Sequence, residues 1–495
     1  MTDLSVDVVV LGAGPVGENV ADRAVQGGLT VAIVERELVG GECSYWACMP
    51  TKALLRDVAA LRAARQVPGA AAAITGELDV AAVLARRDRF ASHWHDDGQV
   101  DWLDSAGITL VRGHGRISGP RAVAVTGPDG TVSTLTARHA VVVATGSSAA
   151  LPPIPGLAET RSWTSREAVS ATEVPHRLAI IGAGVVGTEM ATAFSALGSA
   201  VTLIARDGVL PLVEPYAAEH VVAALREGGV EVLVGADPAS ITRDAEGTVH
   251  IALVGGGTVI ADEVLVATGR RPNTTDISVD QVDLVPGSWL TVDEGLQVLG
   301  PDGGPVGWLY AAGDVNRRAL LTHQGKYQAR ALGDAIAARA AGQPVDLAPW
   351  GRHATTADER AVPQVVFTDP EIAAVGLTTA AARAAGLQAR TVEYDLGAVA
   401  GAALHADGYR GRASMVIDES RNVVVGFTAV GPDVAELVHA ATIAIAGEVP
   451  LERLWHAVPA YPTVSEIWLR LLETAGRPDL RTAAAHLPVP APTSN

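Results

Sequence analysis

The sequence predicts an α/β protein in which one unit of strand, glycine-rich turn, helix and strand occurs twice, followed by a C-terminal α+β domain. Three observations carry this prediction. An apolar run at residues 6–11 leads directly into a glycine-rich turn, and residues 178–187 repeat the pattern. Similar apolar runs, each ending in Ala-Thr-Gly, close the two halves at Gly146 and Gly269. From about residue 355 strands and helices alternate without a further glycine-rich turn of this kind.

The first glycine-rich turn lies between a predicted strand and a predicted helix over residues 18–26. Gly12, Gly14 and Gly17 form this turn, and the strand after the helix ends at Glu35. Such an order is the fingerprint of a Rossmann-type dinucleotide-binding unit. The glycines let the backbone approach a pyrophosphate at the helix N-terminus, and the acid accepts hydrogen bonds from ribose hydroxyls. The sequence therefore predicts a dinucleotide site here.

The second unit differs from the first at the position that recognises the ribose. Its turn contains Gly182, Gly184 and Gly187. The same step that leads from Gly12 to Glu35 leads from Gly182 to Ala205, and Arg206 follows. An arginine there accommodates a 2′-phosphate, which favours NADP over NAD. The alternative is a solvated surface arginine, because residues 207–212 contain no second basic residue.

The chain has two cysteines, Cys43 and Cys48. On a regular helix their Cα atoms would lie about 9 Å apart, whereas a disulfide tolerates at most about 7 Å. The pair therefore closes only where the turn between them is distorted, as the flanking glycines and Pro50 predict. The spacing alone leaves two interpretations open, a pair of buried inert thiols or a redox pair. Two dinucleotide units beside the pair favour an electron path that ends on a dithiol.

Further motifs give the chain a family resemblance. Residues 268–273 read Thr-Gly-Arg-Arg-Pro-Asn, residues 311–315 read Ala-Ala-Gly-Asp-Val, and residues 366–378 contain Asp-Pro-Glu. Over about residues 5–475 the chain resembles the class I pyridine nucleotide-disulfide oxidoreductases, such as lipoamide dehydrogenases, glutathione reductases, mercuric reductases and soluble transhydrogenases. The resemblance implies two Rossmann-type domains, for FAD and NAD(P), plus a C-terminal α+β dimerisation domain.

The repeats and the resemblance together suggest the domain boundaries. We expect an FAD-binding domain over 1–150, an NAD(P)-binding domain over 151–285, a return to the FAD-binding domain over 286–350, a dimerisation domain over 355–480 and a disordered tail over 481–495.

The resemblance also assigns roles to individual residues. FAD would be held by Gly12, Gly14, Gly17, Glu35, Lys52, Thr145, Gly146 and Asp314, and the nicotinamide nucleotide by Gly182, Gly184, Gly187, Arg206 and Gly269. Cys48 would face the flavin and Cys43 would meet the electron acceptor. Lys52 and Glu189 match an ion pair near the flavin N5, where a cation stabilises negative charge on the reduced ring and a nearby thiolate. Two unrelated surface charges are the alternative.

One position departs from the disulfide reductases of the family. They carry a His-Pro-Thr segment whose histidine is a general base, oriented by a glutamate five residues later. Here Tyr461 replaces that histidine, while Glu466 is in place. A phenol with a pKa near 10 is a poor base at neutral pH, and proton transfer typically contributes about 10²–10⁴-fold to a rate. His456 is an alternative base, but a structural role suits it better, given Val458, Pro459 and Pro462 around it.

Tyr461 leaves several electron acceptors open. We expect NADPH to reduce FAD and then the Cys43–Cys48 pair, which passes electrons to a small disulfide or other thiol-reactive acceptor. The alternatives are direct flavin-mediated reduction of a quinone, metal ion or NAD(P)⁺, as in a transhydrogenase, and a lipoamide dehydrogenase-like activity. A non-catalytic flavoprotein scaffold is a further alternative. Mercury fits poorly, because mercuric reductases carry extra cysteines near the C-terminus that this chain lacks.

Composition limits the partners. The net charge of −18 and the pI of about 5.1 argue against nucleic acid and anionic membranes. A strand begins by about residue 6, so we expect no signal peptide and no membrane insertion. A cycling dithiol suits a reducing cytoplasm, and no metal-ligand spacing is present. The resemblance implies a homodimer in which Tyr461 and Glu466 face the partner subunit's dithiol.

Overall fold

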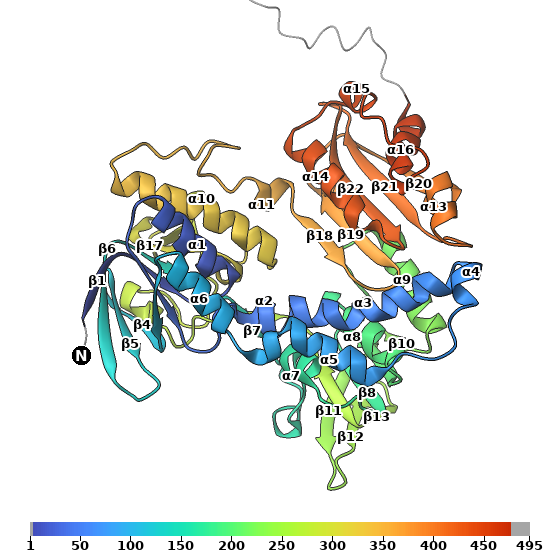
Figure 1. The fold of residues 1–495 in the computed structure, drawn as a ribbon, viewed down its shortest axis with the longest axis horizontal. Helices are drawn as coiled ribbons and strands as arrows, with labels where there is room; N and C mark the ends of the chain where they lie inside the picture. The colour runs from blue at the N-terminus through green and yellow to red at the C-terminus, as the bar shows by residue number, and fades with distance from the viewer. Residues whose placement is uncertain (1–2, 477–495) are drawn as a thin grey trace, which may run out of the picture. The chain divides into compact units, whose positions relative to one another are not determined.

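The structure, a computed structural model, describes residues 3–476, which fall into two compact units (Figure 1). Unit 1 comprises the residues up to 60, 76–210 and 225–362. Unit 2 comprises 61–75, 211–224 and the residues from 363 onward. The predicted disordered tail, 481–495, lies outside the described residues.

The first sheet of unit 1 contains the first glycine-rich turn. Its strand order is β16 (Gln297–Leu299), β17 (Pro305–Ala311), β6 (Val132–Val143), β1 (Leu4–Leu11), β2 (Val31–Glu35) and β3 (Thr109–Arg112). Strands β4 (His114–Gly119) and β5 (Ala122–Thr126) extend from β6 as an antiparallel meander. From β17 to β3 the neighbours are parallel. Side chains of β1 are buried on both faces, which explains its continuous apolar run.

The second sheet of unit 1 repeats this arrangement. Its parallel strands follow the order β10 (Glu231–Val234), β9 (Ala200–Ala205), β8 (Arg177–Ile181) and β14 (Glu263–Val266). Helix α1 (Pro15–Gln26) connects β1 to β2, and α8 (Val185–Ala196) connects β8 to β9 in the same way. β6 pairs with β1 as β14 pairs with β8. The predicted duplication and the α/β fold class are therefore confirmed.

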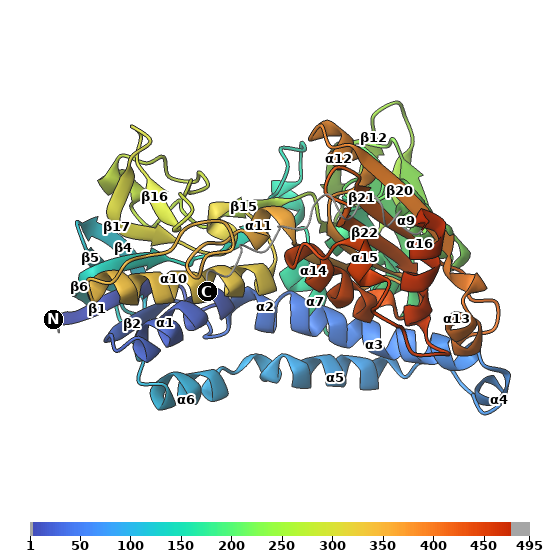
Figure 2. The ribbon, with the colours of Figure 1, turned by 90° about the horizontal axis from the view of Figure 1, so that it is seen from above.

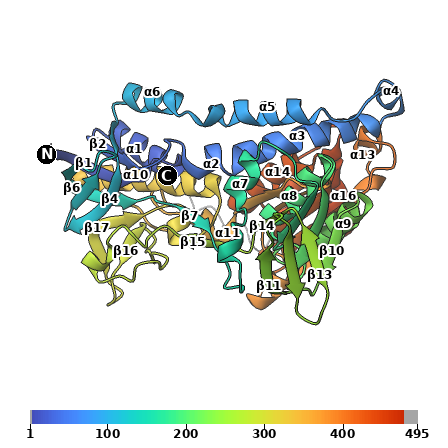
Figure 3. The same ribbon diagram turned by 90° about the horizontal axis from the view of Figure 1, so that it is seen from below.

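Smaller elements complete unit 1. They are the antiparallel sheet of β11 (Pro238–Arg243), β12 (Val249–Leu253) and β13 (Thr258–Ala261), the pair β7 (Ser147–Ala149) and β15 (Arg270–Pro272), and the helices α2 (Gly41–Tyr45), α5 (Val80–Phe90), α6 (Asp97–Ser105), α7 (Ser165–Ser170), α10 (Thr322–Ala340) and α11 (Ala357–Arg360). Helix α3 (Cys48–Arg65) begins in unit 1. In Figures 2 and 3, α5 runs beside α3, and Arg86 Nη1 donates to the carbonyl of Ala53 at 3.0 Å.

Helices α1 and α10 pack side by side over the first sheet (Figures 1 and 2). Their closest approach requires a glycine, because a Cβ on Gly325 would lie 2.5 Å from Val16 Cγ2. The start of α10 is thereby held against the first turn of α1.

Unit 2 is built on an antiparallel sheet in the order β18 (Pro363–Val366), β19 (Glu371–Gly376), β22 (Val423–Gly431), β21 (Arg412–Asp418) and β20 (Ala389–Asp395). Helix α14 (Val438–Ala446) packs on β19 and β22, and α16 (Ile467–Ala475) packs on β20 and β21. The other helices in or entering this unit are α4 (Pro68–Ala71), α9 (Pro215–Glu227), α12 (Thr379–Ala384), α13 (Ala400–His405) and α15 (Leu451–Leu454). The sheet with helices confirms the predicted α+β character.

The observed helices start slightly earlier than the sequence patterns predict. Helix α1 begins at Pro15 rather than at Glu18, because proline is well suited to the first helical position. Helix α8 begins at Val185, directly after Gly184 of the second glycine turn. In the part of the chain that the structure describes, no helix combines the length and apolar character needed to cross a bilayer.

Candidate active site

The two cysteines lie on either side of a break between two helices. Cys43 is in α2 and Cys48 begins α3, and Trp46 between them leaves helical geometry with φ −134° and ψ 6°. Gly40 and Gly41 enter α2 with φ of 108° and 55°. The predicted distortion is confirmed, and it brings the two thiols within hydrogen-bonding reach of one another.

The surroundings of the two thiols make them unequal. The hydrogen bond that Cys48 forms with Cys43 lowers the pKa of Cys48 to about 6. Burial opposes this effect, whereas the Thr322 hydroxyl and the Lys52 cation lower the pKa further. The same hydrogen bond, together with burial, raises the pKa of Cys43. Cys48 Sγ lies 3.5 Å from Thr322 Oγ1 at the start of α10. Near neutral pH the reduced pair therefore holds a thiolate at Cys48 and a thiol at Cys43.

Lys52 and Glu189 form an ion pair, with Nζ 2.7 Å from Oε2. Lys52 lies one helical turn beyond Cys48 in α3, and Glu189 lies in α8, which follows the second glycine turn. The Glu189 side chain is 3% exposed and that of Lys52 is 34% exposed. The alternative interpretation, that Lys52 and Glu189 are two unrelated surface charges, is therefore wrong.

The first glycine turn has the shape that a bound pyrophosphate needs. Gly12 adopts a φ of 98°, and a Cβ on Gly17 would lie 1.9 Å from the carbonyl oxygen of Gly12. A Cβ on Gly14, by contrast, meets nothing within 4 Å, so this glycine keeps space open at the N-terminus of α1. A Cβ on Gly41 would come within 2.9 Å of Gly14 Cα, which places the dithiol segment directly beside the turn.

Glu35 closes the same turn from the end of β2. Its carboxylate is buried and accepts the backbone N–H of Ala13 at 2.8 Å and that of Glu37 at 2.7 Å. These bonds use one acceptor position on each oxygen and leave another for a ribose hydroxyl. The open glycine turn and the oriented acid fit FAD.

The second glycine turn repeats these features. Gly182 adopts a φ of 103°, a Cβ on Gly187 would lie 1.9 Å from the carbonyl oxygen of Gly182, and one on Gly184 meets nothing within 4 Å. At the end of β9, Ala205 is buried. Its neighbour Arg206 is exposed and donates through Nε and Nη2 to Asp207 Oδ2 at 2.9 and 2.8 Å. The turn fits a dinucleotide, and the Arg206 guanidinium is paired with the acidic side chain that follows it in the chain.

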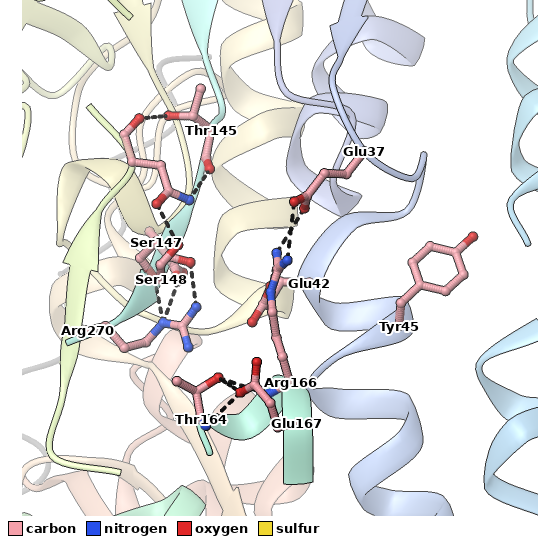
Figure 4. A network of polar contacts seen from close by, with 12 residues as sticks. Glu37, Glu42, Tyr45, Thr145, Ser147, Ser148, Thr164, Arg166, Glu167 and Arg270 are labelled. Atoms are coloured by element: carbon pink, nitrogen blue, oxygen red, sulfur yellow. Dashed lines mark hydrogen bonds and ion pairs between the residues drawn. The ribbon is translucent and has the colours of Figure 1, made fainter. Parts of the chain in front are cut away.

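The segment after the last strand of the first glycine-turn unit contacts the corresponding segment of the second unit. Thr145 Oγ1 donates to the carbonyl of Asn273 at 2.8 Å, and the Asn273 amide returns a bond to the carbonyl of Thr145 at 2.9 Å (Figure 4). The Asn273 N–H also donates to the carbonyl of Gly146, which has a φ of 70°. Gly269, with a φ of 149°, is the second residue of the motif that ends at Asn273. These hydrogen bonds join segments more than one hundred residues apart.

Asp314 is joined to this region through a serine and an arginine. Ser147 Oγ donates to Asp314 Oδ2 at 2.5 Å and accepts from Arg270 Nε at 2.6 Å (Figure 4). Asp314 begins a short 3₁₀ helix, Asp314–Asn316, shortly before α10. Two of the predicted FAD-binding segments, at 145–146 and 314, thus lie together.

Tyr461 and Glu466 belong to unit 2, separately from the dithiol. The Tyr461 side chain is 76% exposed. Glu466 is buried; its Oε1 accepts from Arg470 at 3.4 Å, and its Oε2 has no hydrogen-bond partner among residues 3–476. A Cβ on Gly401 would lie 2.0 Å from the carbonyl carbon of Thr463, so a glycine in α13 is required to pack against this segment.

Sequence reasoning missed two residues around the dithiol. Thr322 contacts Cys48, and Arg166 of α7 contacts Glu42, which directly precedes Cys43. Neither belongs to a motif, and only the fold brings them to the cysteines. Among the described residues, no three His, Cys, Asp or Glu side chains are grouped so that they could hold a metal ion.

Comparison with known proteins agrees with this geometry. Residues 6–341 match the model of the pyridine nucleotide-disulphide oxidoreductase family, and residues 362–471 match the dimerisation domain of that family. A mercuric reductase of Shigella flexneri is 32% identical over 469 residues, covering 93% of this chain and 79% of the relative. A dihydrolipoyl dehydrogenase of Chlamydia muridarum is 30% identical over 468 residues, covering 93% and 95% of the two chains.

Solved structures show the same fold. LpdA from Mycobacterium tuberculosis superposes with a TM-score of 0.79 at 26% identity, covering 96% of this chain and all of that chain. The Cu(II) complex of the HOCl-induced flavoprotein disulfide reductase RclA from Escherichia coli superposes with a TM-score of 0.80 at 22% identity, covering 96% and 99%.

Proposed function

The chain belongs to the pyridine nucleotide-disulfide oxidoreductase family of flavoenzymes, and within it we propose that the protein oxidises NADPH and delivers the electrons to the Cys43–Cys48 pair, for use on a small disulfide or another thiol-reactive acceptor. One observation carries this proposal. The two thiols lie together beside the first glycine turn, with a lowered pKa at Cys48 and the Lys52–Glu189 ion pair one helical turn away.

The glycine turns divide the binding of the two nucleotides. FAD would be held at the first turn by Gly12, Gly14, Gly17, Glu35, Thr145, Gly146 and Asp314, with Lys52 near its ring, and NADPH at the second by Gly182, Gly184, Gly187, Arg206 and Gly269. FAD, when bound, supplies the two-electron relay between a nicotinamide and a disulfide. The absence of an acid at Ala205, followed by the exposed Arg206, favours the 2′-phosphate of NADPH.

The unequal thiols define an order of events on the protein. The sulfur of Cys43 attacks the acceptor disulfide, which forms a mixed disulfide and releases the first product thiolate. The thiolate of Cys48 then attacks the sulfur of Cys43, which closes the Cys43–Cys48 disulfide and releases the second product thiolate. The acceptor thus gains two electrons, and the two products take up the proton of Cys43 and one proton from water. The Lys52 cation stabilises the Cys48 thiolate between turnovers.

Tyr461 should limit the rate at which Cys43 attacks the acceptor disulfide. Cys43 must lose its proton, and an exposed phenol accepts one poorly at neutral pH. Glu466 keeps a buried carboxylate oxygen that has no hydrogen-bond partner among the described residues, at the place where the family orients a histidine. In the dimer, which the dimerisation domain supports, Tyr461 and Glu466 would complete the partner subunit's site. Exposed apolar side chains of unit 2, including Leu404, Ile443 and Val458, are available for such a contact.

The same tyrosine favours a second candidate function. With no histidine base at position 461, the enzyme would reduce a quinone, a metal ion or NAD(P)⁺ directly, and the dithiol would only store electrons. A reducing compartment such as the cytoplasm suits both candidates, because the dithiol has to be regenerated.

Purified enzyme with Cys43→Ala separates the two candidates. NADPH oxidation is measured with oxidised thiols, quinones and thio-NAD⁺ as acceptors. Loss of turnover with the oxidised thiols, together with intact flavin reduction by NADPH, supports the dithiol route. Full turnover of the variant with every acceptor would exclude exchange at Cys43 and leave direct transfer.

A further inference from the structure

Arg166 lies at the centre of a set of contacts on the segment that carries Cys43 (Figure 4). Its Nε donates to Glu42 Oε2 at 2.8 Å, and its Nη2 donates to Glu37 Oε2 at 3.0 Å. Its guanidinium carbon lies 4.2 Å from the centroid of the Trp46 ring. Glu42 directly precedes Cys43, and Trp46 is the residue at which the helix breaks. Arg166 therefore contacts the residue that precedes Cys43 and the tryptophan three positions after it.

These contacts use properties that are specific to arginine. The planar guanidinium binds two carboxylates and stacks on an indole at once, whereas a lysine ammonium would be a single point charge. The two acids differ in setting, since the Glu42 side chain is 22% exposed and that of Glu37 is 42% exposed. The more buried contact is the one beside Cys43.

Both ends of the helix that carries Arg166 are anchored. At the N-terminus of α7, Thr164 and Glu167 form a capping box, in which Glu167 Oε2 accepts the Thr164 N–H at 2.7 Å. At the C-terminus, Arg87 Nη1 donates to the carbonyls of Val169 and Ala171 at 2.6 and 2.9 Å. Arg87 is 2% exposed. Arg166 thus projects from a fixed support rather than from a mobile loop.

A strained turn gives the cysteine segment a second support. Ser92, His93 and Trp94 have φ values of 49°, 51° and 57°, a left-handed run that is rare for residues other than glycine. This run lets Trp94 Nε1 donate to the carbonyl of Tyr45 at 3.2 Å. Strain of this kind persists only where the surrounding structure enforces it. The Arg87 guanidinium carbon lies 5.5 Å from the Trp94 ring, so one buried arginine contacts both supports of the segment.

We propose that Arg166 is a positioning residue for the dithiol: by fixing Glu42 and Trp46, it holds Cys43 against Cys48. Holding two reacting groups in register raises their effective concentration and favours the bond between them. The reaction concerned converts the two thiols into a disulfide, while an acceptor disulfide takes up the two electrons and two protons and becomes two thiols. This role rests on the proposed function, because it matters for turnover only if the pair cycles.

The test is the equilibrium between the enzyme dithiol and a glutathione redox buffer. Flavin-loaded wild type, Arg166→Gln, Glu42→Ala and Glu37→Ala are equilibrated without oxygen at one pH, and the thiols are alkylated and counted by mass spectrometry. Arg166→Gln and Glu42→Ala should each lower the equilibrium constant for the Cys43–Cys48 disulfide about tenfold, which corresponds to about 30 mV. Glu37→Ala, which removes the other carboxylate contact of Arg166, farther along the chain from Cys43, should stay within about twofold of wild type.

Arg166→Lys tests whether the positive charge alone suffices. On a logarithmic scale it should recover less than half of the decrease in the equilibrium constant that Arg166→Gln causes. Equilibrium constants of Arg166→Gln and Glu42→Ala equal to wild type would overturn the proposal, as would an equal loss in Glu37→Ala. If Arg166→Gln does not fold, the comparison of Glu42→Ala with Glu37→Ala decides the question. Failure of the proposed function would appear in a different measurement, as full turnover of Cys43→Ala with every acceptor.

Discussion

Lys52 Nζ lies 2.7 Å from Glu189 Oε2, and this ion pair joins the helix that begins at Cys48 to the helix that follows the second glycine turn. The two halves of the duplicated fold thus meet in one charged contact beside the redox pair. The buried carboxylate belongs to the second unit, and the cation belongs to the helix that begins at Cys48, where it favours a thiolate.

Replacing Lys52 with Met should destabilise the enzyme by about 1–3 kcal/mol, because the nearly buried Glu189 loses its cation. It should also raise the pKa of Cys48, since the Lys52 charge helps to lower it. Urea unfolding of the flavin-loaded protein measures the first effect. Arg177→Met is the matched control: its ion pair with Asp262 is more exposed, so its loss should destabilise the protein less than Lys52→Met does.

The pKa of about 6 at Cys48 predicts a pH dependence of the reduced enzyme. A thiol whose pKa is lower in the folded than in the unfolded state stabilises the folded state. This contribution is fully present above the pKa of the thiol in the unfolded chain, about 8.5. That contribution is lost as the pH falls through about 6, because the folded thiolate is then protonated. Ultraviolet thiolate absorbance should therefore rise around pH 6 in wild type. In Cys43→Ala, which removes the hydrogen-bond donor to Cys48, this rise should move to higher pH, and an unchanged titration would contradict the assignment.

Substitutions of the glycines in the two turns should distinguish effects on cofactor binding from effects on folding. Gly14→Ala and Gly184→Ala place a methyl group in open space, so the free protein should keep its stability. Gly14→Ala should weaken FAD retention, and Gly184→Ala should raise the KM for NADPH while sparing FAD. Gly17→Ala is the contrasting variant, because its methyl group would collide with the Gly12 carbonyl and should lower the unfolding temperature.

Asp207 should weaken the preference for NADPH, because it already occupies Nε and Nη2 of Arg206. Asp207→Asn should lower the KM for NADPH several-fold and leave that for NADH nearly unchanged. Arg206→Ala should raise the KM for NADPH by about tenfold, the scale of one lost charge-assisted contact. Steady-state kinetics with both nucleotides measures these effects, and equal changes for NADPH and NADH would contradict the 2′-phosphate assignment.

Tyr461→His should accelerate reduction of a small disulfide at neutral pH by about 10²-fold, the lower end of the range for general base catalysis. The buried Glu466 carboxylate is available to orient the new imidazole. Tyr461→Phe should change the rate little, because the phenol is not expected to act as the base. A loss of activity in Tyr461→Phe would show instead that the hydroxyl takes part.

The fold and the two glycine turns could be predicted from the sequence because their signals are local. Gly12 and Gly17 are recognisable from a spacing of five residues, and the observed φ and close contacts explain why each must be glycine. The distortion between Cys43 and Cys48 likewise followed from their spacing and from the neighbouring glycines. The domain boundaries and the roles of the site residues remain predictions.

By itself, the sequence determined that the protein is a duplicated α/β flavoenzyme with one pair of cysteines, because strand, glycine turn and helix are each encoded within about ten residues. Only the tertiary structure decided what surrounds that pair. Thr322 is 274 positions from Cys48, and Arg166 is 124 positions from Glu42. Such contacts leave no periodicity or spacing in the chain, because they form only when separate elements pack. The asymmetry of the two thiols, and the arginine that we propose positions them, belong to the packed molecule.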